Sequence, residues 1–127
     1  MVLRSSDMLT AMNILYVDDE KDLLELASTF FEDEKIPLDV ASDFSQALEL
    51  LRAKKYDLII ADIRMPSGSG IELVSRARAE FAFKGKFILV SGDIKPGDSY
   101  PGCDLTMNKP LDFFLLIDSV KGLLQNK

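Results

Sequence analysis

The chain has 127 residues, of which 47% are hydrophobic, and its formal net charge is −6. This length predicts one domain with a core that needs no disulfide or structural metal, and the hydrophobic content excludes intrinsic disorder. The acidic balance argues against a broad nucleic-acid-binding face.

The sequence contains no histidine and one cysteine, Cys103. The lack of histidine excludes Ser-His-Asp and Cys-His nucleophilic sites and disfavours a zinc site. Cys103 is then better explained as a small filler side chain than as a reactive thiol. No apolar stretch approaches the length of a membrane span, and residues 1–12 lack the apolar segment of a signal peptide. We therefore expect a cytoplasmic protein with a loose tail over residues 1–12 and one domain over residues 13–127.

The first part of the domain alternates short apolar strands with amphipathic helices. Residues 13–17 form an apolar strand that ends at an acidic cluster, residues 18–20. The helix that follows has an apolar face at three- and four-residue spacings, made of Leu23, Leu24, Leu26, Ala27, Phe30 and Phe31. A short strand over residues 38–41 comes next. Asp43 then predicts an N-cap, with Gln46 completing an imperfect capping box, for a helix that buries Phe44, Ala47, Leu48 and Leu51.

The segment Tyr56–Pro66 carries the most informative pattern of the chain. Its continuous apolar run, residues 58–61, is typical of a strand buried on both faces of a parallel sheet. The run ends at Asp62, which would lie at the carboxyl end of a central strand, where open α/β sheets place their ligand chemistry. A Gly-rich loop over residues 67–70 follows.

The last part of the chain continues the alternation with one interruption. A helix marked by Ile71, Val74, Ala77 and Phe81 precedes a strand over residues 87–90 that ends at Ser91. Residues 92–102 hold two prolines and three glycines, which predicts a long loop. A strand over residues 105–107 follows, and Pro110 is expected at or near the first position of the last helix. The inner face of that helix consists of Phe113, Leu116, Ile117, Val120 and Leu124.

This order of elements predicts a parallel sheet with right-handed crossovers and helices on both faces. All strands of such a sheet point the same way, so their carboxyl ends bring together Asp18, Asp19, Asp62, Ser91 and Lys109. Gathered carboxylates repel one another unless a cation lies among them, and oxygen ligands of this kind suit Mg²⁺, or Mn²⁺. A divalent cation, a lysine and a hydroxyl can hold a phosphoryl group, and the central Asp62 is the candidate nucleophile.

At these residues the sequence resembles the receiver domain of two-component response regulators. The matching segments are Val17–Glu20, Asp57–Pro66, Ser91–Gly92 and Lys109–Pro110, in the expected order, and the resemblance covers about residues 13–124. It implies a flavodoxin-like three-layer sandwich with a five-stranded parallel sheet of order 2-1-3-4-5.

The resemblance also implies roles for individual residues. Asp62 would accept a phosphoryl group from a sensor histidine kinase or phosphotransfer protein. Asp19, Asp62 and the backbone carbonyl of Arg64 would bind Mg²⁺, and Asp18 would assist through water. Ser91 would contact the phosphoryl oxygens and Lys109 would pair with them; the Lys109–Pro110 bond would be cis.

Other residues qualify these expectations. The Arg64 side chain is expected to face solvent at the mouth of the site. Asp93, two residues after Ser91, is a candidate for modulating the access of attacking water. The family usually has a helix where this chain has residues 92–102, and a Tyr or Phe at the position of Thr106. We therefore expect that helix to be short or replaced by a loop, and signalling to run through ordering of this loop.

Four further hypotheses concern the oligomeric state and alternative functions. Loss of that helix removes a common dimerisation surface, which suggests a monomer or weak dimer with a downstream protein partner that the sequence does not name. The missing switch aromatic leaves open a pseudo-receiver, a protein-interaction module that is not phosphorylated. An Asp-nucleophile phosphohydrolase is disfavoured because Arg64 stands where those enzymes commonly place a second Asp, and a flavodoxin-like FMN protein is disfavoured because no phosphate-cradling loop follows the first strand.

Overall fold

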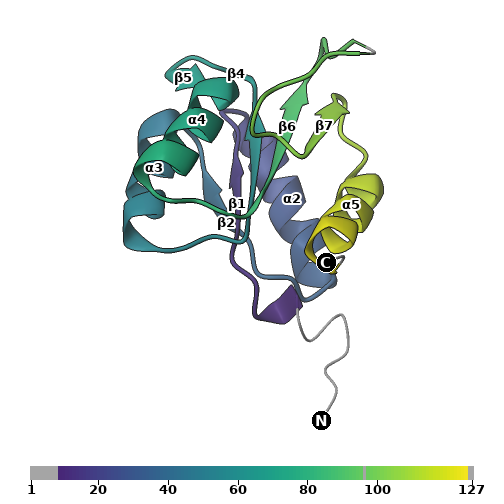
Figure 1. The fold of residues 1–127 in the computed structure, drawn as a ribbon. Helices are drawn as coiled ribbons and strands as arrows, with labels where there is room; N and C mark the ends of the chain where they lie inside the picture. The colour runs from purple at the N-terminus through teal and green to yellow at the C-terminus, as the bar shows by residue number, and fades with distance from the viewer. Residues whose placement is uncertain (1–8, 96, 126–127) are drawn as a thin grey trace.

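The computed structural model of the chain describes residues 9–95 and 97–125. Its centre is a five-stranded parallel sheet of order β2-β1-β3-β6-β7, which confirms the predicted order (Figure 1). The strands are β1 (Ile14–Val17), β2 (Asp39–Ala41), β3 (Leu58–Asp62), β6 (Lys86–Ser91) and β7 (Leu105–Asn108). The continuous apolar run of β3 is buried along its whole length, as expected for a central strand covered on both faces.

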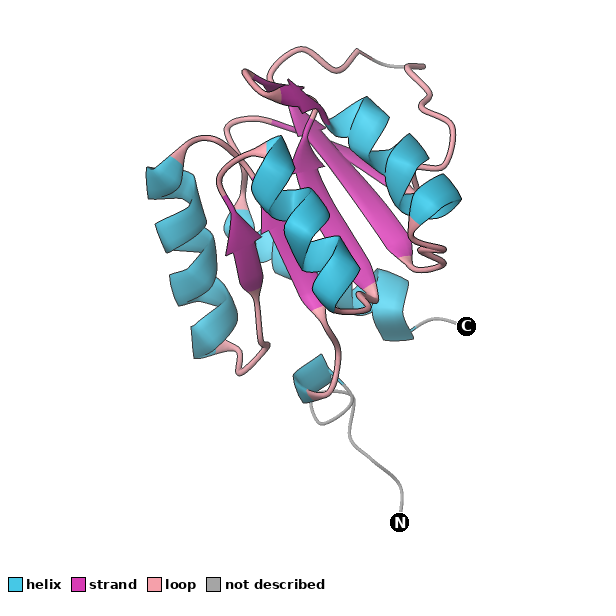
Figure 2. Cartoon of the chain, turned by 90° about the vertical axis from the view of Figure 1, so that its left-hand side faces the viewer, coloured by secondary structure: helices cyan, strands magenta, loops and turns pink. Residues whose placement is uncertain are grey.

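Two pairs of helices cover the two faces of the sheet. Helices α2 (Lys21–Asp33) and α5 (Phe113–Gln125) pack on one face, and α3 (Phe44–Ala53) and α4 (Gly70–Glu80) pack on the other (Figures 1 and 2). Successive strand residues point to opposite faces, so Leu15 joins the core under α3 and α4 while Tyr16 joins the core under α2 and α5. The three-layer sandwich follows from this alternation in every central strand.

The register of the sheet aligns the carboxyl ends of its strands. Val17 lies opposite Ala61, and Asp62 lies opposite Val90. Ser91 lies opposite Asn108, so the residues that leave β1, β3, β6 and β7 emerge at one edge.

A side chain caps the start of α3, and backbone hydrogen bonds close the end of α2. Asp43 accepts a 2.8 Å hydrogen bond from the Gln46 backbone N–H, which confirms the predicted N-cap of α3. The capping box is incomplete, since the Gln46 side chain accepts from Ser42 instead of returning to Asp43. Helix α2 ends with Lys35 in the left-handed region at φ 58°, and the N–H of the buried Ile36 reaches back to the Phe31 carbonyl.

Two details of the helices differ from the prediction. The last helix begins at Phe113, not at Pro110, because Asp112 accepts hydrogen bonds from the backbone N–H groups of Phe114 and Leu115 and thereby acts as the cap. Leu26, expected on the apolar face of α2, is 48% exposed, and Ile71 of α4 is likewise 40% exposed. Each lies two positions from a buried leucine, Leu24 or Leu73, and a two-residue step on a helix turns a side chain about 200° away.

Between β6 and β7, the described residues 92–95 and 97–104 form no helix or strand, which agrees with the predicted loop. Arg78 of α4 ties its far end down, donating hydrogen bonds of 3.0 and 2.7 Å to the Gly102 carbonyl. The same guanidinium donates to the carbonyls of Phe83 and Gly85.

Two further features extend the predicted outline. The Gly-rich stretch contains a small antiparallel hairpin of β4 (Arg64–Met65) and β5 (Gly68–Ser69). Leu9 is 1% exposed and belongs to the core under α2 and α5, so the packed part of the chain begins before Asn13; residues 1–8 of the expected tail lie outside the described residues. No helix within the described ranges is both long and apolar enough to cross a membrane.

Candidate functional site

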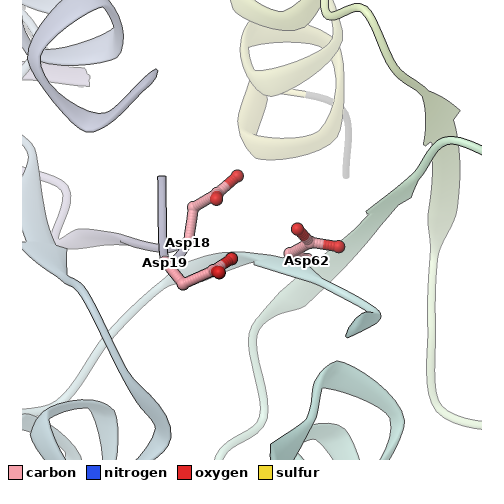
Figure 3. Close-up of side chains that lie close together, drawn as sticks. All are labelled: Asp18, Asp19 and Asp62. Atoms are coloured by element: carbon pink, nitrogen blue, oxygen red, sulfur yellow. The ribbon is translucent and has the colours of Figure 1, made fainter. Parts of the chain in front are cut away.

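Three carboxylates meet at the carboxyl edge of the sheet. Asp18 and Asp19 follow β1, Asp62 ends β3, and one oxygen of each lies within 4.8 Å of the others (Figure 3). Asp18 is 0% and Asp62 is 6% exposed, whereas Asp19 is exposed. The structure thus brings together the three acids that the sequence predicted as metal ligands.

Lys109 joins this cluster from the end of β7. Its Nζ lies 2.8 Å from Asp62 Oδ2 and 3.1 Å from Asp18 Oδ2. Burial by itself would lower the pKa of Lys109, but the hydrogen bonds to Asp62 and Asp18 outweigh it and raise that pKa, so the lysine is charged. The Lys109–Pro110 bond is cis, as the resemblance implied.

Burial also raises the pKa of Asp18, although hydrogen bonds from the Glu20 backbone and from Lys109 oppose the shift. Beneath it, the buried Tyr16 hydroxyl donates to Asp18 at 3.4 Å. Burial and the Asp18 charge raise the pKa of Tyr16, so the phenol stays neutral and acts as a donor. Asp18, Asp19 and Asp62 offer three carboxylates against the single positive charge of Lys109, and this excess of negative charge favours a second cation.

The donor set fits a small divalent cation. Mg²⁺ binds oxygens at about 2.0–2.1 Å, so two ligands on one ion lie at most roughly 4.2 Å apart. The three acids need only small side-chain adjustments from their 4.8 Å limit to share an ion. The backbone N–H of Arg64 donates to Asp62 Oδ1 at 3.0 Å, and the Arg64 carbonyl belongs to the same short segment that follows β3.

Ser91 lies at the end of β6, 2% exposed, beside this cluster in the sheet. Its hydroxyl donates a 2.6 Å hydrogen bond to Asp93 Oδ1, and that hydrogen bond lowers the pKa of Asp93. Asp93 also forms an ion pair with Arg64, whose side chain is 77% exposed, as expected at the mouth of the site. Thr106 lies on β7, opposite Leu89 of β6.

Sequence reasoning missed two members of the site, Tyr16 and Glu20. Glu20 Oε1 lies 3.8 Å from Lys109 Nζ, and Tyr16 supports Asp18 from below. Tyr16, Asp18 and Glu20 are two residues apart in the chain. The two-residue period of an extended segment is the signal that could have found them.

Comparison with known proteins identifies the family. Residues 14–116 match the model of the response regulator receiver domain, and the chain belongs to this family. Among curated relatives, the transcriptional regulatory protein DltR of Streptococcus agalactiae is 31% identical over 94 residues, covering 74% of this chain and 42% of DltR. Response regulator GtcR of Aneurinibacillus migulanus is 35% identical over 92 residues, covering 72% of this chain and 37% of GtcR. The chain thus spans less than half the length of these two relatives.

Solved structures give the same result. A two-component response regulator from Clostridium difficile superposes with a TM-score of 0.83 at 25% identity, covering 91% of this chain and 97% of that one. Response regulator TrrA from Thermotoga maritima, solved in complex with Mg(2+)-BeF, gives a TM-score of 0.77 at 32% identity, covering 88% of this chain and 98% of that one.

Proposed function

We propose that this chain is a phosphoacceptor switch that receives a phosphoryl group on Asp62 from a histidine kinase or a phosphotransfer protein. The observation that carries the proposal is the position of Lys109 Nζ, within 3.1 Å of both Asp62 and Asp18. A charged lysine held against two buried carboxylates at a sheet edge is suited to neutralise a phosphoryl group that arrives there.

Each residue of the site has a separate role in the proposed phosphoryl transfer. An oxygen of the ionised Asp62 carboxylate attacks phosphorus, the new O–P bond forms, and the P–N bond to the donor imidazole breaks. The imidazole leaves as a neutral ring because its other nitrogen takes up a proton from solvent. Lys109 pairs with one phosphoryl oxygen and the Ser91 hydroxyl donates to another. Asp18, Asp19, Asp62 and the Arg64 carbonyl would hold Mg²⁺, or Mn²⁺, which supplies positive charge for the remaining oxygens.

A mass measurement tests this function. The protein is incubated with Mg²⁺ and a small acyl phosphate, and its intact mass is recorded. The natural chain is expected to gain one phosphoryl group, and Asp62→Asn is expected to gain none. If the natural chain stays unmodified across several donors and with a purified histidine kinase, the pseudo-receiver becomes the better reading.

The second candidate, a phosphorylation-independent interaction module, is favoured by two observations. The Ser91 hydroxyl already donates to Asp93, and Thr106 stands where the family usually carries a switch aromatic. An Asp62→Asn variant that binds the partner as tightly as the natural chain does, with or without a phosphoryl donor, would support this candidate.

We further propose that the readout runs through the loop of residues 92–102. Three contacts support this proposal: Asp93 accepts a hydrogen bond from Ser91 and pairs with Arg64, and the Ile94 backbone N–H donates to Asn108 Oδ1 at 3.0 Å. Capture of Ser91 by a phosphoryl group would release Asp93 and change the order of the loop. Hydrogen exchange with and without beryllofluoride is expected to differ there, and unchanged protection would contradict this readout.

A further inference from the structure

A cavity lies at the opposite end of the sheet from the acidic site. Its volume is about 850 Å³, and it is lined by the C-terminal end of α3, by residues 54–57, which lead into β3, and by residues 81–85, which follow α4 and lead into β6. The two sites are therefore separated by the length of the central strands. This volume is within the range of about 300–1,000 Å³ that small-molecule sites occupy.

The cavity gathers positive charge on an acidic protein. Arg52, Lys54, Lys55 and Lys84 line it, four of the 15 lysines and arginines of the chain, with Asp57 as its one acidic residue. The Asp57 carboxylate already has a hydrogen-bond donor, because its Oδ2 accepts a 2.8 Å hydrogen bond from the Asn13 backbone N–H.

The helix dipole and an ion pair already account for two of the four basic residues of the cavity. Basic residues in the last turn of a helix are favoured by the helix dipole, which accounts for Arg52. Lys54 pairs with Asp39 at 2.8 Å. Lys55 and Lys84 lie beyond the helix ends, and within residues 9–95 and 97–125 neither has an ion-pair partner.

The remaining wall of the cavity is apolar. It includes Leu51, Phe81 and Phe83, and the Arg52 guanidinium lies 5.9 Å from the centre of the half-buried Phe81 ring. Two ammonium groups without partners match the charge of one phosphate monoester, which is about −1.5 to −2 at pH 7. An apolar wall beside them fits a flat, apolar body attached to that phosphate.

We propose that this cavity binds a small molecule with a phosphate monoester on a flat apolar body, of the nucleoside monophosphate class. The ammonium groups of Lys55 and Lys84 contact the phosphate, and the apolar body packs against the Phe81 ring. The site acts independently of phosphorylation at Asp62, so the two proposals stand or fall separately.

Titration with AMP, adenosine and inorganic phosphate, without Mg²⁺, tests the proposal by NMR. AMP is expected to shift the amide resonances of residues 52–57 and 81–85 and to leave those around Asp62 unchanged. Adenosine and inorganic phosphate, which each lack one half of the ligand, are expected to bind more weakly than AMP.

A charge-matched pair of variants makes the test specific. Lys55→Gln with Lys84→Gln is expected to weaken AMP binding by at least roughly tenfold, since each lost charged hydrogen bond is worth that much. Lys95→Gln with Lys121→Gln has the same net charge and leaves the cavity intact, so its affinity should equal that of the natural chain. The proposal is overturned if AMP binds both double variants equally, if millimolar AMP leaves residues 52–57 and 81–85 unshifted, or if only an acidic peptide binds there.

Discussion

The Ser91 hydroxyl donates a 2.6 Å hydrogen bond to Asp93, and Arg64 pairs with the other oxygen of the same carboxylate. The hydroxyl expected to contact the phosphoryl group is therefore committed to a loop residue. Asp93 and Arg64 together hold Ser91 in this orientation.

Replacing Asp93 by Ala is expected to release the Ser91 hydroxyl and to speed phosphorylation of Asp62. In the natural chain this hydrogen bond to a charged acceptor must break before Ser91 can reach a phosphoryl oxygen, so the increase should be up to roughly tenfold. The rate of mass gain with a small acyl phosphate measures it. Asp33→Ala, which removes an exposed carboxylate of α2 instead, should leave the rate unchanged; equal rates in the two variants would show that Asp93 does not restrain Ser91.

Replacing Lys109 by Met is expected to destabilise the fold by about 3 kcal/mol without divalent cations, because it leaves two buried carboxylates without their cation. Urea unfolding measures the loss, and added Mg²⁺ should restore part of it. As a control, Lys121→Met removes an exposed pair with Glu34 and should cost less than about 1 kcal/mol. A Lys109 variant as stable as this control would contradict the balance of charge described for the site.

Replacing Gly70 by Ala is expected to cost about 2 kcal/mol and to disturb Asp62. A Cβ at Gly70 would lie 2.4 Å from the Asp62 carbonyl oxygen, so the backbone that carries Asp62 would have to move. Thermal unfolding and the phosphorylation rate report the two effects. Gly122→Ala meets no atom within 4 Å in α5 and should instead stabilise by about 0.5–1 kcal/mol. Similar behaviour of both variants would exclude close packing at Gly70.

Asp39 gives a pH-dependent test of the other end of the sheet. Burial alone would raise the pKa of Asp39, but hydrogen bonds from Lys54 and Tyr56 outweigh it and lower that pKa. A lowered folded-state pKa contributes stability above the unfolded value of about 3.9, and this contribution is lost as pH falls through the folded value.

Asp39→Asn should therefore be less stable than the natural chain at pH 7, by up to about 1 kcal/mol since the carboxylate is 37% exposed. The difference should shrink at pH values below about 3.9. Urea unfolding from pH 3 to 7 measures it, with Asp118→Asn on the exposed side of α5 as the control. A difference that stays constant over this range would rule out the ionised Asp39 as its source.

The sequence by itself determined the succession of strands and helices and the identity of the acidic cluster, and the order of the strands in the sheet followed from the resemblance to receiver domains. Apolar runs and helical periods are local patterns, and parallel strands must end at one edge, so Asp18, Asp19, Asp62, Ser91 and Lys109 could be assigned to that edge without coordinates. The loop at residues 92–102 was predicted from equally local information, because its prolines and glycines oppose a helix.

The tertiary structure alone decided which partners these side chains take. Whether Ser91 donates to Asp93, or Lys109 bridges Asp18 and Asp62, depends on distances between segments far apart in the chain. The same holds for the cationic cavity, since residues 52–57 and 81–85 meet only through the packing of α3 beside α4. Periodicity specifies the face on which a side chain lies, whereas its hydrogen-bond partner depends on how the packed elements come together.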